Sequence, residues 1–129
     1  AGSGEVLNKS GKPAKTPMFI HRADGEPLAV AGLWAAWKEP GSPADAPWLH
    51  TCTVITTSAN ATMAPVHDRM PVVLPKSAWD AWLDPRNQDM FALQQLLVPA
   101  ADGVHLQHVV GTDVNNVRNK GAGLIEPVA

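Results

Sequence analysis

The chain has 129 residues and a formal net charge of −2, with 45% hydrophobic and 17% charged residues. Such a composition is typical of one globular domain, or part of one, and excludes a disordered chain. Its apolar runs are too short to span a membrane, so we expect no membrane partner. Because the net charge is slightly negative, any nucleic-acid binding must come from a local basic groove.

The first half of the chain predicts three strands, over residues 16–20, 28–37 and 48–57. Asp24-Gly25 supplies the positive-φ position of a tight turn between the first two, so we expect these two strands to pair as a hairpin. Gly32 interrupts the second strand, which indicates a bulge or the close approach of another backbone.

The second half predicts one strand, two short helices and a last strand, over residues 70–74, 78–83, 87–98 and 104–110. Asn60, ahead of them, is expected to cap a short turn. Strands and helices do not alternate regularly along the chain. The order of elements therefore favours the α+β class, with a mixed and mainly antiparallel sheet and two or three short helices.

Two apolar features are interpreted as structural. Met90, Phe91, Leu93 and Leu97 recur at helical spacing, which indicates a helix face that packs on the core. Cys52 lies inside a predicted strand, where a cysteine is most often a small buried hydrophobic residue. As the only cysteine it also excludes an intramolecular disulfide, which fits a reducing compartment.

The charged triplet His67-Asp68-Arg69 lies between two apolar runs and is the first candidate for a catalytic site. Histidine changes its charge near neutral pH, and a neighbouring carboxylate or guanidinium adjusts that behaviour. His67 is therefore the candidate for general acid–base catalysis, with Glu5 as the one early carboxylate that could converge on it. The competing interpretation is an ordinary solvated turn between two strands.

No metal and no cofactor are expected. His105 and His108 lie three positions apart on a predicted strand, so their side chains point to opposite faces. No cysteine or carboxylate follows at the spacing of a zinc site, and neither Gly-rich phosphate-binding motif occurs.

Several segments in chain order resemble a known family, the SOS response-associated peptidase (SRAP) domain. TVITTSAN at residues 53–60 and HDRMPVVL at residues 67–74 are similar to the family's TIITTxAN and HDRMPVIL segments. RADGEPL at residues 22–28, AGLW at residues 31–34 and WDAWL at residues 79–83 also match family motifs. The likeness covers about residues 2–127.

This resemblance implies a single α+β domain over residues 1–129 that recognises an abasic site in single-stranded DNA. In the family, a cysteine at the mature N-terminus forms a thiazolidine crosslink with the ring-opened sugar and is linked to autopeptidase activity. The resemblance assigns acid–base work at the sugar to His67 and phosphate contacts to Arg69 and Thr56. It also places Glu5 at the glutamate of the family's GFYEW motif, although neither aromatic residue nor the tryptophan of that motif is present.

The family begins with Met-Cys-Gly-Arg, whereas this sequence begins with Ala1. We therefore expect the C-terminal portion of the domain, with half of a site and no crosslinking on its own, and leave open whether it is an enzyme. The alternative is a non-catalytic single-stranded DNA-binding or interaction module. A half-domain leaves sheet edges unpaired, so we expect self-association, strand swapping or packing on a missing segment. Residues 1–20 show no signal peptide, and the implied location is the cytoplasm, at the nucleoid if the protein is bacterial.

Overall fold

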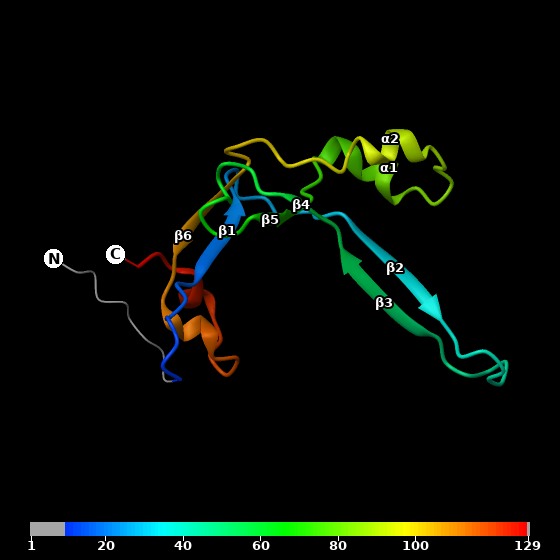
Figure 1. Cartoon of the computed structure of the whole chain (residues 1–129), viewed down its shortest axis with the longest axis horizontal. Helices are drawn as coiled ribbons and strands as arrows, with labels where there is room; N and C mark the ends of the chain where they lie inside the picture. The colour runs from blue at the N-terminus through cyan, green and yellow to red at the C-terminus, as the bar shows by residue number, and fades with distance from the viewer. Residues whose placement is uncertain (1–9, 129) are drawn as a thin grey trace. The chain divides into compact units, whose positions relative to one another are not determined.

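The structure is a computed structural model that describes residues 10–128. The chain divides into two compact units: unit 1 joins Ala1–His21 to Leu106–Ala129, and unit 2 is Arg22–His105. Short antiparallel sheets and a few short helices confirm the predicted α+β class (Figure 1). The strands are β1 (Met18–Arg22), β2 (Gly32–Trp37), β3 (Leu49–Val54), β4 (Thr56–Ser58), β5 (Arg69–Pro71) and β6 (His105–Val109), and the α-helices are α1 (Trp79–Leu83) and α2 (Met90–Gln94).

Unit 1 is built on a two-stranded sheet of β1 and β6. The end of the chain returns to β6, where the backbone N–H of Val128 donates to the carbonyl oxygen of Val109 at 3.0 Å. On this sheet the rings of Phe19, His21 and His108 gather, with their centroids 5.4 to 5.6 Å apart. Two 3-10 helices, Thr112–Asn115 and Ala122–Ile125, follow β6.

The predicted pairing of residues 16–20 with residues 28–37 is wrong. The turn itself forms, since Gly25 has a φ of 78° and its N–H donates to the carbonyl oxygen of Arg22 at 3.2 Å. After the turn, however, the chain pairs with a later segment, and the N–H of Leu74 donates to the carbonyl oxygen of Ala29 at 2.8 Å. The tight turn therefore reverses the chain without closing a hairpin.

In unit 2, β2 instead pairs antiparallel with β3, from Gly32 opposite Val54 to Trp37 opposite Leu49. Gly32 explains how closely these strands approach, because a Cβ atom on it would lie 2.8 Å from the carbonyl oxygen of Thr53. The prediction of a close backbone approach at Gly32 is thus confirmed. The hairpin extends from the rest of unit 2, and a loop joins its two strands (Figure 1).

The predicted strand over residues 48–57 is divided at Ile55 into β3 and β4. Ile55 donates its N–H to Ala31 at 2.9 Å and accepts a bond from the N–H of Val72 at 2.9 Å, and Ala31 in turn donates to Val72 at 2.8 Å. This junction carries the small core of unit 2. The core consists of buried Ala31, Val72 and Leu74 with partly buried Ile55, Trp79, Trp82, Leu96 and Leu97 packed against it.

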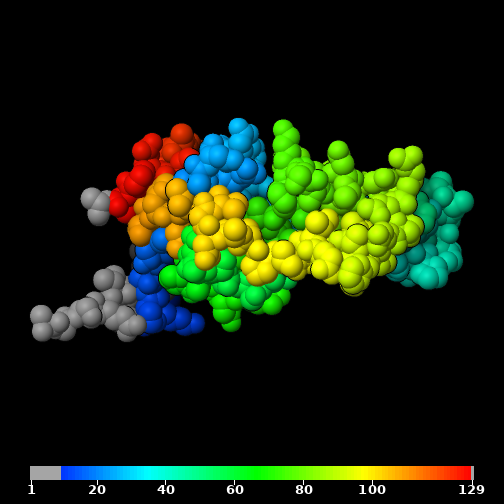
Figure 2. All heavy atoms as spheres, turned by 90° about the horizontal axis from the view of Figure 1, so that it is seen from above, coloured from blue at the N-terminus to red at the C-terminus, as the bar shows by residue number. Residues whose placement is uncertain are grey.

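Both structural interpretations of apolar features need correction. Met90 and Phe91 are 63% and 76% exposed, so only the Leu97 end of the predicted apolar face reaches the core. Figure 2 shows the α1–α2 segment, in green to yellow, at the molecular surface. Cys52 is also exposed, because the whole of β3 is exposed. Within residues 10–128 no helix is long and apolar enough to cross a membrane.

Candidate functional site

The triplet His67-Asp68-Arg69 stands at the end of a loop, residues 59–68, that joins β4 to β5 and is called the His67 loop below. β4 and β5 pair antiparallel, with Ser58 opposite Arg69. The N–H of Ala59 donates to the carbonyl oxygen of Asp68 at 3.0 Å and closes the loop at its base. The ribbon thus brings the TTSAN and HDRMP segments side by side.

Asn60 and Asp102 fix the other side of the His67 loop. The side-chain oxygen of Asn60 accepts a bond from the N–H of Met63 at 3.0 Å, which confirms its predicted role as a cap. Its side-chain nitrogen donates to the carbonyl oxygen of Ala100 at 2.9 Å, and the carboxylate of Asp102 accepts a bond from the N–H of Ala61 at 2.8 Å. Within the loop, the side chain of Met63 is buried.

The imidazole of His67 is 66% exposed, and its Nδ1 atom has two neighbours of opposite character. The backbone N–H of Arg69 donates to Nδ1 at 3.0 Å, and the Oδ1 atom of Asp68 also lies 3.0 Å from Nδ1. The first contact suits a ring whose Nδ1 is unprotonated, and the second suits a ring whose Nδ1 carries a proton. Nδ1 therefore has a partner in either state, and Nε2 has no hydrogen-bond partner among residues 10–128.

Arg69 and Thr56 are brought together across the β4–β5 ribbon. The Nη2 atom of Arg69 lies 3.0 Å from both the carbonyl oxygen and the Oγ1 atom of Thr56. No residue between 10 and 128 accepts a hydrogen bond from Nε or Nη1 of Arg69. His67 lies two positions before Arg69, the first residue of β5, and both residues are exposed.

The structure therefore assembles three of the four predicted site residues, namely His67, Arg69 and Thr56, whereas Glu5 lies outside the described residues. Sequence reasoning missed Asp102, which lies 41 positions from the N–H that it accepts. No local signal could have found it, because an aspartate in a polar turn is unremarkable in sequence.

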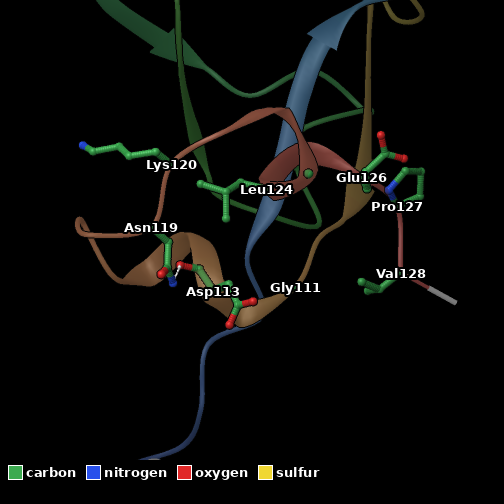
Figure 3. A pocket seen from close by; sticks show the side chains of 9 residues that line it. Gly111, Asp113, Asn119, Lys120, Leu124, Glu126, Pro127 and Val128 are labelled. Carbon is green, nitrogen blue, oxygen red and sulfur yellow. Dashed lines mark hydrogen bonds between the residues drawn. The ribbon is translucent and has the colours of Figure 1, made fainter.

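The predicted site residues His67, Arg69 and Thr56 do not line any of three cavities found within residues 10–128. In unit 1, a cavity of about 490 Å³ lies beside the two C-terminal 3-10 helices. Figure 3 shows Asn119 directed at Asp113, whose carbonyl oxygen it bonds at 2.9 Å, with Lys120 and Glu126 elsewhere on the rim. The lining holds two carboxylates and one lysine, and this mixture of charges does not point to one class of ligand.

The described residues contain no cluster of three or more metal-ligating side chains. His105 and His108 lie on opposite faces of β6, as predicted: His105 is buried, and Nε2 of His108 lies 2.8 Å from the carbonyl oxygen of Ile125. Both ring nitrogens of His105 lack a hydrogen-bond partner among residues 10–128.

Comparison with known proteins identifies relatives. A profile of the family described as "SOS response associated peptidase (SRAP)" matches residues 6–117. The abasic site processing protein YoqW of Bacillus subtilis is 40% identical over 113 residues, which cover 87% of this chain and 48% of that protein. The abasic site processing protein YedK of Escherichia coli is 32% identical over 118 residues, or 88% of this chain and 50% of that protein.

A solved structure has the same fold. The crystal structure of a protein from Bacteroides thetaiotaomicron superposes with a TM-score of 0.74 at 21% sequence identity. The match covers 97% of this chain and 53% of that one. The chain thus spans about half the length of YoqW, of YedK and of this solved protein.

Proposed function

Because this chain belongs to the SRAP family, we propose that it forms one side of a binding site for an abasic site in single-stranded DNA. The relatives in two bacteria carry the name abasic site processing protein, and their matched regions include the His67 and Arg69 segments. The observation that carries the proposal is the Arg69–Thr56 contact beside an exposed His67 imidazole. The guanidinium of Arg69 supplies a cation at the start of β5, and the imidazole of His67, two residues earlier, can donate or accept a proton.

Arg69 is proposed to hold a backbone phosphate next to the lesion. Its Nη2 atom is occupied by Thr56, and this contact orients the guanidinium on the β4–β5 ribbon. The N–H groups of Nε and Nη1 have no acceptor among residues 10–128, and each can donate a charge-assisted hydrogen bond to a phosphate oxygen. Thr56 then acts by positioning Arg69, and its backbone remains part of the ribbon.

His67 is proposed to transfer protons when the sugar ring opens. At an abasic site the closed hemiacetal opens when the bond between C1′ and the ring oxygen breaks, the C1′ hydroxyl loses its proton and the ring oxygen gains one. When the N–H of Arg69 binds Nδ1, Nε2 carries a proton that it can donate. When Nδ1 is protonated and faces Asp68, a neutral ring has a free Nε2 that can accept one. Both directions of transfer are therefore supported.

The thiazolidine crosslink of the family needs a cysteine with a free α-amine, because nitrogen and sulfur both bind C1′. Cys52 is the only cysteine in the sequence, and its nitrogen is part of the backbone of β3. The covalent step is therefore assigned to residues outside this sequence, and this chain contributes phosphate binding and proton transfer. If the residues that make the crosslink are not supplied, the function is the second candidate, a non-catalytic single-stranded DNA-binding module.

Binding of paired oligonucleotides tests the proposal. Two fluorescent single strands of the same sequence are compared by anisotropy, one with a tetrahydrofuran abasic analogue and one with an intact base. We expect the abasic strand to bind about tenfold tighter, equivalent to about 1.4 kcal/mol. Equal affinity that still depends on Arg69 identifies the non-catalytic module. Absence of binding to either strand contradicts both candidates.

A further inference from the structure

Unit 2 contains a cavity of about 440 Å³, lined by the start of the 3-10 helix Lys76–Ala78 and by the segment that links α2 to β6. It is called the Lys76 cavity below. Its size is within the range of small-molecule sites, which is about 300 to 1,000 Å³. Much of its lining is aliphatic and comes from Val73, Leu74, Leu96, Val98 and Val104.

The lining of the Lys76 cavity is held by contacts that exist without a ligand. Leu74 is buried in the core of unit 2, and Leu96 packs against that core. Ala100, which also lines the cavity, is fixed by the His67 loop, because the side-chain nitrogen of Asn60 donates to its carbonyl oxygen at 2.9 Å. The cavity is therefore largely formed in advance, as small-molecule sites usually are.

The charges on the lining have one sign. Of the described residues that line the cavity, Arg22 and Lys76 are charged and none is a carboxylate. The charge of Arg22 is offset by Asp24, whose carboxylate accepts a bond from Nε at 2.9 Å and another from Nη2 at 2.5 Å. Lys76 is exposed, and its ammonium has no partner among residues 10–128. The cavity thus combines an apolar lining with one ammonium that lacks a counterion.

We propose that the Lys76 cavity binds a small organic monoanion, namely a carboxylate attached to an apolar ring or chain. The carboxylate accepts charge-assisted hydrogen bonds from Lys76, and the apolar body covers the aliphatic lining. A single negative charge matches the one lysine that lacks a counterion. The inference is independent of the proposed DNA function, because His67, Arg69 and Thr56 do not line this cavity.

Two other occupants fit the Lys76 cavity less well. A nucleotide carries many polar groups that lose water on binding, and Gln95 is the one uncharged polar side chain among the described lining residues. Its phosphate would also need a second cation, whereas Arg22 is already paired with Asp24. An uncharged apolar group matches the aliphatic lining but leaves Lys76 without a counterion.

The experiment uses the full chain, labelled with ¹⁵N, and three small probes. Naphthylacetate has the apolar body and the charge, naphthylacetamide has the same body without the charge, and acetate has the charge alone. Amide chemical shifts in NMR titrations give both the Kd and the place of binding. We expect naphthylacetate to produce saturable shifts at Leu96, Ala100 and Val104 and to bind about tenfold tighter than naphthylacetamide. Acetate should shift none of these amides.

Three variants sharpen the test. Lys76→Gln should raise the Kd of naphthylacetate by about tenfold and leave that of naphthylacetamide unchanged, because it removes only the ammonium. Ala101→Phe fills the cavity from an exposed position and should weaken both probes by about tenfold or more. Lys120→Gln makes the same charge change beside the cavity of unit 1 and should alter neither Kd.

Four results overturn the proposal. The first is naphthylacetate that produces no saturable shift at the amides of the Lys76 cavity. The second is an equal Kd for the acid and the amide, which makes the occupant an uncharged apolar group such as a side chain of another protein. The third is a preference for the acid that is lost in Lys120→Gln and kept in Lys76→Gln, and the fourth is a set of shifts confined to β2 and β3. No DNA enters the experiment, so its failure is distinct from failure of the proposed function.

Discussion

The Nη2 atom of Arg69 lies 3.0 Å from both the carbonyl oxygen and the hydroxyl oxygen of Thr56, so one nitrogen joins the two strands of the β4–β5 ribbon. A phosphate bound to the rest of this guanidinium would meet a cation that is already oriented. Arg69→Ala should therefore lower affinity for single-stranded DNA and reduce the slope of log K against log salt by about 0.7, the value for one phosphate contact.

Titrations at several salt concentrations measure this slope. Arg86→Ala serves as the matched control, because Arg86 is also exposed and carries the same charge, and its contact is with Asp84. An identical loss of slope in both variants would mean that Arg69 contributes only its charge. Arg69→Lys should recover part of the affinity, since lysine supplies the charge without the planar, multi-donor guanidinium.

His67→Gln should slow opening of the sugar ring in the complex. The exchange between closed and open forms of an abasic site labelled with ¹³C at C1′ can be followed by saturation-transfer NMR. We expect a decrease of about 100-fold, the usual lower range for a lost general acid–base catalyst. His50→Gln alters an exposed histidine of β3 and should have no effect. Equal rates in the wild type and His67→Gln would exclude the proton-transfer role.

Gly32→Ala should destabilise unit 2, because the new Cβ atom would lie 2.8 Å from the carbonyl oxygen of Thr53 and the strands would have to separate. The expected cost is about 1 to 3 kcal/mol, as for other overpacking substitutions. Urea unfolding followed by circular dichroism measures it. Gly123→Ala is the control, since no atom lies within 4 Å of its added Cβ.

Met70→Ala should destabilise the chain by about 2 to 5 kcal/mol, because the side chain is almost fully buried and leaves a cavity. Met90→Ala removes the same side chain from an exposed position of α2 and should change stability by less than about 0.5 kcal/mol. If the two variants unfold at the same urea concentration, the assignment of the core is wrong.

Asp24→Asn should destabilise the chain at neutral pH and not in acid. Hydrogen bonds from the Arg22 guanidinium and the N–H of Glu26 hold the pKa of the Asp24 carboxyl below its usual value. The carboxylate therefore contributes stability above the pKa of an unfolded aspartate, and this contribution disappears as the pH falls through the lower folded value. The gap in urea midpoint between wild type and variant should close with decreasing pH, and salt should narrow it.

Sequence reasoning succeeded where the signal was local. The turn at Gly25, the cap at Asn60 and the close approach at Gly32 each follow from the chemistry of one or two residues. The α+β class follows from the order of the predicted elements. The opposite orientation of His105 and His108 likewise follows from the alternation of side chains along a strand.

Sequence reasoning failed where a contact joins residues that are far apart in the sequence. The turn at Gly25 gave no information on which strand would pair with β2, and Asp102 became part of the His67 loop through a contact that only the fold creates. Met90, Phe91 and Cys52 were expected to be buried because they are apolar, yet burial depends on what covers a surface. For these residues the described part of the chain supplies no cover.

The positions of the tryptophans determine what the intrinsic fluorescence of this protein can report. Three of the five, Trp34, Trp37 and Trp48, are exposed in or next to the hairpin, and Trp79 and Trp82 are partly buried at the core. The folded chain should therefore already emit at the long wavelength of water-exposed indole, with little change on denaturation. A blue shift of that emission would report a newly covered hairpin, which makes the intrinsic fluorescence a sensor of assembly and a poor measure of unfolding.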